Sequence, residues 1–193
     1  MKKILIYEYI TGGGLLNEDL TSDLMSEANM ITSSVYDSCR KLKYIKHNYF
    51  RDFRLSSVNE KESIVLRDNS KIYDIDFLRK YDYVLPILPE IDMSLYLYVE
   101  YLEKNGVDAV ISNSQTIKTC SDKLKFYKFC QKNSLPAIDT YQKYSSNLHN
   151  KLLLIKDRYG AGCSHIEITK NKKNLELIKD DKIIQPYITG DDY

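Results

Sequence analysis

The chain has 193 residues and a formal net charge of +1, and 43% of its residues are hydrophobic. It is long enough to bury a core as one large domain or as two small ones, and its balanced charge gives no electrostatic case for nucleic-acid binding. The cysteines show neither metal-ligand spacing nor close pairs, which predicts a cytoplasmic protein with reduced thiols, no zinc and no disulfide.

The apolar run at the start of the chain predicts a first strand rather than a signal peptide. The run is short, carries Glu8, and breaks at Gly12 without a small-residue cleavage site. No other segment is long enough to span a membrane. We therefore expect no membrane partner.

Strands and helices alternate through the first half of the chain. We expect strands at residues 3–9, 44–49, 63–67, 83–87 and 109–112, and helices at 18–42, 74–80 and 93–105. The long first helix carries apolar residues at spacings of three and four, namely Leu20, Leu24, Ala28, Ile31 and Val35. Such alternation predicts a parallel sheet with right-handed crossovers, so residues 1–113 are expected to form an open α/β domain.

The pattern changes near residues 113–121, where we expect a domain boundary. Ser121 is the expected N-cap of a helix that runs to Asn133, and Pro136 ends that element. Strands follow at 152–156, 165–169 and 183–188, with a weak helical pattern at 174–178. Residues 114–193 are therefore predicted to form a linker helix and the first part of an α+β domain.

Two lysines and a glycine-bearing turn carry the strongest functional signal. Lys156 ends an apolar run and precedes the sequence Gly160-Ala161-Gly162, while Lys123 lies at the start of the predicted helix. Each lysine also has an ordinary interpretation, as an exposed residue at a strand end or a helix start. A triphosphate, however, needs positive donors from several directions, and glycines let backbone N–H groups close over it. A cation near a helix N-terminus is also unfavourable unless an anion offsets it.

The last predicted strand contains Pro186, which lacks an N–H group and so weakens sheet pairing. The ordinary interpretation of this segment is an edge strand.

The order of these segments resembles the ATP-grasp superfamily of carboxylate–amine ligases. The stretch from Ile4 to Leu15, with its Thr11-Gly12-Gly13-Gly14 turn, further resembles an archaeal-type branch that includes tyramine–glutamate ligases of methanofuran biosynthesis. The motifs are short, but they occur together in the family's order over nearly the whole chain. The resemblance implies a Rossmann-like parallel-sheet pre-ATP-grasp domain followed by an incomplete α+β ATP-grasp lobe.

The resemblance also implies an ATP site in the second half of the chain. Lys123 and Lys156 would contact the phosphates, the main chain at the last strand would read adenine, and Asp192 would bind the ribose. The implied nucleotide-binding residues are Lys123, Lys156, Gly160, Ala161, Gly162, Gln185, Tyr187, Ile188 and Asp192. Two positions depart from the family, with Asp157 where proline is usual and Asp192 where glutamate is common.

A second set of candidates follows the first strand, at the sheet edge where open α/β folds bind ligands. These are the glycines Gly12, Gly13 and Gly14, with Glu8 and Glu90 near strand ends as carboxylates that would hold an ammonium or a polar substrate group. Such carboxylates are often only solvated loop residues. The glycines do not fit the G-x-G-x-x-G spacing, which disfavours a third interpretation, an NAD-binding Rossmann domain.

The expected activity is an ATP-dependent ligation that activates a carboxylate as an acyl phosphate and passes it to an amine. Positioning and charge neutralisation do most of the work in such phosphoryl transfer. Mg²⁺ is the implied metal, with its ligands expected beyond Tyr193, so the 193 residues alone are expected to be a truncated, inactive part of the enzyme. The expected partners are a small-molecule acid and amine, and a homo-oligomer is left open. The alternative is a non-catalytic nucleotide- or small-molecule-binding α/β module.

Overall fold

A computed structural model describes residues 1–160, 166–170, 175 and 178–190. The chain divides into two compact units. One unit comprises Met1–Pro89 with Leu97–Ser114, and the other comprises Glu90–Tyr96 with Gln115–Tyr193. The domain limits expected from the sequence, 1–113 and 114–193, stay a prediction, because compactness alone does not define an independent domain.

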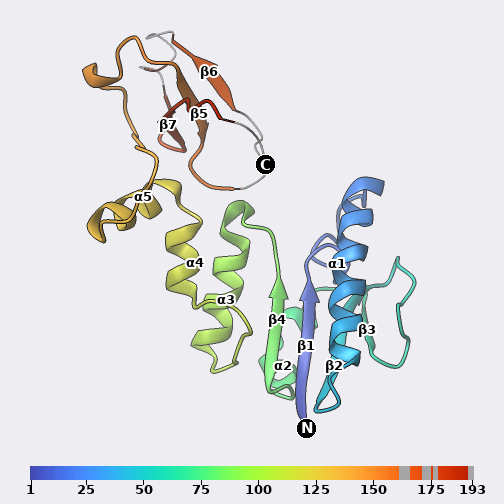
Figure 1. Ribbon diagram of the computed structural model, residues 1–193. Coiled ribbons are helices and arrows are strands. Elements are labelled where there is room, and N and C mark those ends of the chain that lie inside the picture. The colour runs from blue at the N-terminus through green and yellow to red at the C-terminus, as the bar shows by residue number, and fades with distance from the viewer. Residues whose placement is uncertain (161–165, 171–174, 176–177, 191–193) are drawn as a thin grey trace. The chain divides into compact units, whose positions relative to one another are not determined.

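The first unit contains a four-stranded parallel sheet with the strand order β3-β2-β1-β4 (Figure 1). Its strands are β1 (Lys2–Glu8), β2 (Ile45–Asp52), β3 (Ser63–Leu66) and β4 (Tyr83–Ile87). The first strand pairs in parallel with both β2 and β4, so it lies inside the sheet. The predicted α/β fold with a parallel sheet is confirmed.

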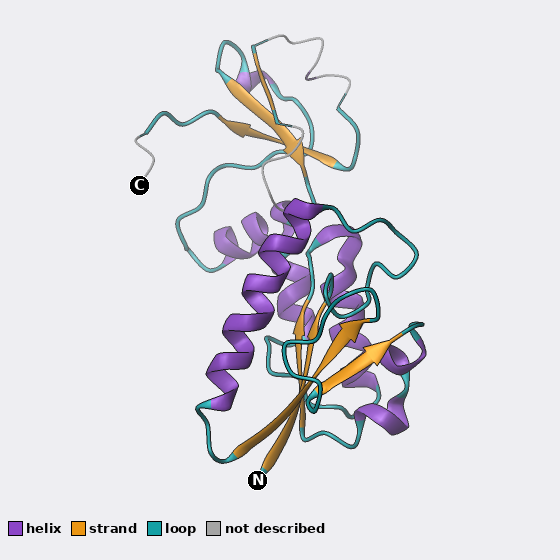
Figure 2. Cartoon of the chain, turned by 90° about the vertical axis from the view of Figure 1, so that its right-hand side faces the viewer, coloured by secondary structure: helices purple, strands orange, loops and turns teal. Residues whose placement is uncertain are grey.

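Both faces of this sheet are covered by other elements of the unit. On one face Ile6 packs with residues of α1 (Ser22–Arg40). On the other face Leu5 and Tyr7 belong to a core completed by η1 (Ser70–Tyr73), α2 (Ile75–Leu78) and α3 (Ser94–Lys104). In Figure 2 the orange strands of this sheet fan out from one another, the twist that L-residues impose on a sheet.

The predicted apolar face of the first helix is wrong in part. Leu24 is exposed, and the buried stripe is instead formed by Ala28, Thr32, Tyr36 and Cys39. The stripe contains a threonine because the Thr32 hydroxyl is hydrogen-bonded to the Thr11 hydroxyl at 2.8 Å. A buried hydroxyl with a partner is compatible with a core, and apolar periodicity alone does not reveal it.

The strand predicted at residues 109–112 is not formed. Ala109 makes only an isolated parallel bridge with Val84. The chain turns away after Val110, whose side chain is exposed together with that of Ile111. One bridge orders this segment beside β4, but one residue pair is not enough for a strand.

The second unit contains a three-stranded antiparallel sheet in the order β6-β5-β7. Its elements are η2 (Ile91–Met93), α4 (Ser114–Cys120), α5 (Lys123–Lys132), η3 (Ser146–Leu148), β5 (Leu153–Asp157), β6 (Glu167–Thr169) and β7 (Lys182–Pro186). Leu148, Leu153, Ile155, Leu175 and Ile184 form its core. Parts of the predicted strand at 165–169 and of the predicted helix at 174–178 lie outside the described residues.

The predicted start of the linker helix is wrong, because there are two helices and Ser121 caps neither of them by its side chain in the way expected. The N-cap of α5 is Asp122, whose Oδ1 accepts hydrogen bonds from the backbone N–H groups of Leu124 and Lys125, both at 3.1 Å. A carboxylate satisfies two unpaired amides and also carries the charge that a helix N-terminus favours.

No helix in the described part of the chain has the length and apolar character that a membrane crossing requires.

Candidate functional site

Lys123 lies close enough to Lys156, within the second unit, to be affected by its charge. Lys156 is the fourth residue of β5, and Lys123 is the first residue of α5. The Lys123 Nζ donates to the Gly160 carbonyl at 2.7 Å, and the Lys123 backbone N–H donates to the Arg158 carbonyl at 3.1 Å. The lysine of the helix therefore contacts the turn that follows the strand of the other lysine.

The two ammonium groups repel each other across this turn. Burial lowers the pKa of Lys123 below its ordinary value of 10.5, and the charge of Lys156 lowers it further. The carboxylates of Asp157, Glu90 and Asp122 act in the opposite direction. Because two nearby cations destabilise each other, an anion held between them would relieve the repulsion. The arrangement suits a ligand with several negative charges.

A buried ion pair, which the sequence analysis did not predict, holds α5 against the end of β5. The Asp122 carboxylate has no solvent exposure and accepts from Arg158 Nε at 2.8 Å and Nη2 at 2.7 Å. Burial by itself would raise the pKa of Asp122, but the hydrogen bonds from Arg158 and from the Lys125 backbone outweigh it and hold the pKa below 3.8. Asp122 directly precedes Lys123, and Arg158 follows Lys156 by two positions, so the pair brings the lysines together.

Lys156 shares one face of the sheet with Gln185. Leu154 is opposite Gln185 and Lys156 is opposite Ile183 in the antiparallel pairing of β5 with β7. Side chains two residues apart stand on the same face of a strand. The core of the unit uses the other face, where Leu153 and Ile155 pack. A ligand along the Lys156 face would meet the ammonium at one end and the carboxamide at the other.

The outer edge of β7 offers backbone groups next to Pro186. Ile184 exchanges both of its backbone hydrogen bonds with Tyr141, at 2.8 and 2.9 Å, on the side away from β5. Backbone groups alternate in direction along a strand. The Pro186 carbonyl therefore points to the same side as the N–H and carbonyl groups of Ile184, away from β5. The Tyr187 N–H points back to β5, where it donates to the Leu152 carbonyl at 2.9 Å. The proline therefore removes no hydrogen bond from the β5 pairing.

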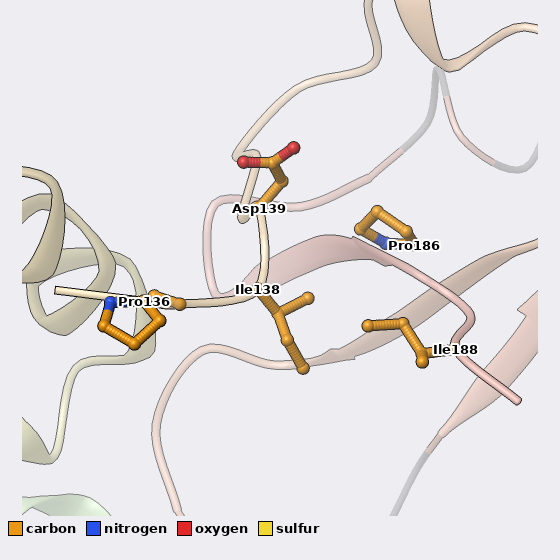
Figure 3. Close-up of a pocket in the computed structure, with 6 residues that line it drawn as sticks. Pro136, Ile138, Asp139, Pro186 and Ile188 are labelled. Atoms are coloured by element: carbon orange, nitrogen blue, oxygen red, sulfur yellow. The ribbon is translucent and has the colours of Figure 1, made fainter. Parts of the chain in front are cut away.

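A cavity of about 530 Å³ lies at this edge. It is lined by Pro136, Ala137, Ile138, Asp139, Pro186 and Ile188. In Figure 3 the side chains of Ile138 and Ile188 point toward each other across it. Both isoleucines are largely exposed, at 47% and 63%. The pocket is open to solvent, and its lining is mainly apolar.

The structure describes only part of the predicted nucleotide-binding set. Gly160 has φ +88°, a left-handed conformation that glycine adopts without strain. Ala161, Gly162 and Asp192 lie outside the described residues. The binding roles of the whole set stay predictions.

The candidates in the first unit have structural partners of their own. The Glu8 carboxylate, which is buried, accepts from the backbone N–H groups of Ile10 and Thr11 and from the Thr11 hydroxyl. A Cβ at Gly12 would lie 2.3 Å from the Glu8 carbonyl oxygen, and Gly13 has φ +90°. The turn itself therefore accounts for Glu8 and for these glycines, and their substrate role stays a prediction.

Glu90 belongs to the second unit, not to the unit of Glu8. Its charge partly opposes the lowering of the Lys123 pKa, so Glu90 acts on the lysine site. The next residues include Asp92 and Met93, which have φ values of 50° and 62°. Non-glycine residues seldom adopt such angles, and strain of this kind concentrates near functional sites.

Within the described residues, no group of three or more His, Cys, Asp and Glu side chains could hold a metal ion. The expectation that the ligands for Mg²⁺ lie beyond Tyr193 stays a prediction.

Residues 120–193 match the family model of the ATP-grasp domain. A search of curated proteins found no match.

Solved structures match nearly the whole chain. An ATP-grasp superfamily protein from Archaeoglobus fulgidus aligns with a TM-score of 0.72 and 22% identity, over 98% of this chain and 54% of that chain. N5-carboxyaminoimidazole ribonucleotide synthetase from Thermotoga maritima aligns with a TM-score of 0.58 and 18% identity, over 97% of this chain and 46% of that one. The ATP complex of D-alanine–D-alanine ligase from Bacillus anthracis aligns with a TM-score of 0.54 and 16% identity, over 98% of this chain and 61% of the ligase.

At these identities the likeness is one of fold, and the chain spans between 46% and 61% of the length of these three structures. Residues 120–193 thus match the ATP-grasp domain, and the chain as a whole has the fold of ATP-grasp proteins.

Proposed function

We propose that the chain forms the phosphate- and base-binding part of an ATP-dependent carboxylate–amine ligase. The observation that carries this proposal is the contact of Lys123 with the Gly160 turn beside Lys156, where two cations repel each other. The phosphates of ATP would place their negative charge between these ammonium groups. The base would lie at the outer edge of β7, beside the cavity that Pro186 and Ile188 line.

The proposed reaction has two steps. A carboxylate oxygen attacks the γ-phosphorus of ATP, so that ADP leaves and an acyl phosphate forms. The amine then attacks the acyl carbon, the amide bond forms, and phosphate leaves with the electron pair of the broken C–O bond. In both steps the lysines hold phosphate oxygens in place and offset their charge, which is the main protein contribution to phosphoryl transfer.

The substitution Lys156→Ala tests the phosphate site. We expect it to weaken binding of a non-hydrolysable ATP analogue about 10- to 100-fold, because a hydrogen bond to a charged group contributes about 1.5–3 kcal/mol. A ¹⁵N NMR titration measures the affinity even when binding is weak. Lys151→Ala is the matched control, since Lys151 is exposed and lies outside the site. If both variants bound the analogue as tightly as the wild type, Lys156 would be an ordinary surface lysine with no role in phosphate binding.

The proposal also names the acid and the amine that the ligase would join. Glutamate and tyramine are the acid and amine that the resemblance of residues 4–15 suggests. Release of ADP, measured with pairs of acids and amines, tests this choice. A ligase that releases ADP only with another pair would contradict it.

The 193 residues alone are expected to release no ADP, because the Mg²⁺ ligands are proposed to lie beyond Tyr193. A coupled assay with ATP, Mg²⁺, glutamate and tyramine tests this expectation. Magnesium-dependent ADP formation by the 193-residue chain would contradict the proposed position of the metal ligands.

A further inference from the structure

The carboxamide of Gln185 is held by one neighbouring side chain. Its Nε2 donates to the Thr140 hydroxyl at 2.8 Å, and the Thr140 Oγ1 donates to the Ile138 carbonyl at 2.9 Å. Gln185 and Thr140 are both buried, at 8% and 4% exposure. The bridge between Tyr141 and β7 keeps the threonine beside the strand.

The protons in this chain of bonds settle which way the carboxamide points. A backbone carbonyl only accepts, so the contact with Ile138 uses the single proton of the Thr140 hydroxyl. The hydroxyl oxygen can then only accept from Gln185, and the group facing it must be the NH₂. An amide rotated by half a turn would set two acceptors against each other. The Gln185 oxygen is therefore the atom turned away from Thr140.

That oxygen is the free acceptor of the side chain. Within the described residues no protein group donates to Gln185 Oε1. Gln185 stands on the face of Lys156 and Leu154, and the next residue, Pro186, lines the cavity. A ligand that extends from Lys156 to the end of β7 would pass this oxygen.

We propose that Thr140 is a positioning residue that makes the site select purines with an amino group at C6. This inference rests on the proposed function. An amino group donates to the Gln185 oxygen, as in adenine, whereas the 6-oxo group of hypoxanthine or guanine would place a second acceptor against it. A buried polar group left without a partner is what gives a site strong discrimination.

The test compares the affinities for ATP and for ITP, which carries an oxygen where ATP carries the amino group. We expect the wild-type chain to prefer ATP about 10- to 100-fold, the range set by one unpaired buried polar group. Thr140→Val keeps the shape of the side chain and removes the hydroxyl, so the carboxamide is free to rotate and the preference should fall to within about threefold. Thr140→Ser keeps the hydroxyl and should keep the preference.

A second readout does not involve a nucleotide. The side-chain NH₂ protons of Gln185 should exchange slowly with solvent in the wild type and in Thr140→Ser, and fast in Thr140→Val, as followed by ¹⁵N NMR. Unchanged amide exchange, or an unchanged ratio of ATP to ITP affinity in folded Thr140→Val, would overturn the inference while ATP binding and the proposed function stand. If the wild type binds neither nucleotide, the proposed function and the base selection fall together.

Discussion

At the residue scale, the charged side chains near the candidate site serve two purposes. The charge of Lys156 is unfavourable for the nearby charge of Lys123. The ion pair of Asp122 with Arg158 stabilises the arrangement that brings the two lysines together. A charge removed from water needs a partner with several hydrogen bonds. The Asp122 carboxylate has four such bonds, from two backbone amides and from two nitrogens of Arg158.

The low pKa of Asp122 predicts how the stability of the second unit depends on pH. The pKa of Asp122 is lower in the folded chain than in the unfolded chain. Ionised Asp122 therefore stabilises the fold fully above about pH 4, the ordinary pKa of an aspartate. This stabilisation is lost as the pH falls through the pKa of Asp122 in the folded chain. Asp122→Asn should remove this acid dependence and lower the free energy of unfolding at pH 7 by about 1.5–3 kcal/mol. Urea unfolding at several pH values measures both effects.

Asp37→Asn is the control for this prediction, since Asp37 is exposed on α1 and forms an exposed ion pair with Arg40 at 3.8 Å. Exposed pairs of this kind contribute little to stability. If Asp122→Asn and Asp37→Asn had the same pH profile, the buried ion pair would not be what holds α5 to β5.

At the element scale, the turn after β1 depends on glycine for reasons internal to the protein. Gly12 donates its N–H to the Glu8 carbonyl at 2.8 Å, and a Cβ there would meet that same oxygen at 2.3 Å. A Cβ at Gly14 would meet Tyr9 at 2.4 Å. The glycine cluster is thus explained by a tight turn whose backbone passes close to β1.

Gly12→Ala is expected to lower the free energy of unfolding by about 1–3 kcal/mol, because the carbonyl in contact belongs to the backbone and cannot move aside cheaply. Gly190→Ala is the control, since a Cβ there meets nothing within 4 Å. Thermal unfolding of the two variants measures the difference. A Gly12→Ala protein as stable as the wild type would show that the turn rearranges easily, and the glycines would then need a functional explanation.

At the scale of the whole molecule, the two units have separate cores. Leu5 is fully buried in the core of the parallel sheet, and Leu153 is fully buried in the core of the antiparallel sheet. Neither core includes residues of the other unit. Local stability in a protein often follows such units.

Leu153→Ala should therefore reduce the protection of amide hydrogens in β5 and β7 and leave β1 to β4 nearly unchanged, and Leu5→Ala should do the reverse. Each substitution removes a fully buried leucine side chain, which typically costs about 2–5 kcal/mol. Hydrogen exchange followed by mass spectrometry resolves the two regions. Equal loss of protection in both units for either variant would mean that they unfold as one.

The sequence by itself predicted the parts of this structure that have a local signal. The parallel α/β architecture follows from the alternation of apolar runs with helical patterns, and β4 (Tyr83–Ile87) was predicted to the residue because Tyr83 to Ile87 is an apolar run between charged segments. Lys156 and Lys123 were singled out by their place beside a strand, a helix start and glycines. These features depend on neighbours in the chain, so periodicity and turn chemistry reveal them.

Only the tertiary structure decided which distant side chains meet. Asp122 and Arg158 are separated by 36 positions, and Thr140 and Gln185 by 45. Such polar contacts have no periodic signature, because each member alone reads as an ordinary surface residue or cap. The burial that makes each pair specific exists only after α5 and the segment around Thr140 have packed against the sheet. The hydrogen-bonding partners of the site could therefore not be predicted from the sequence.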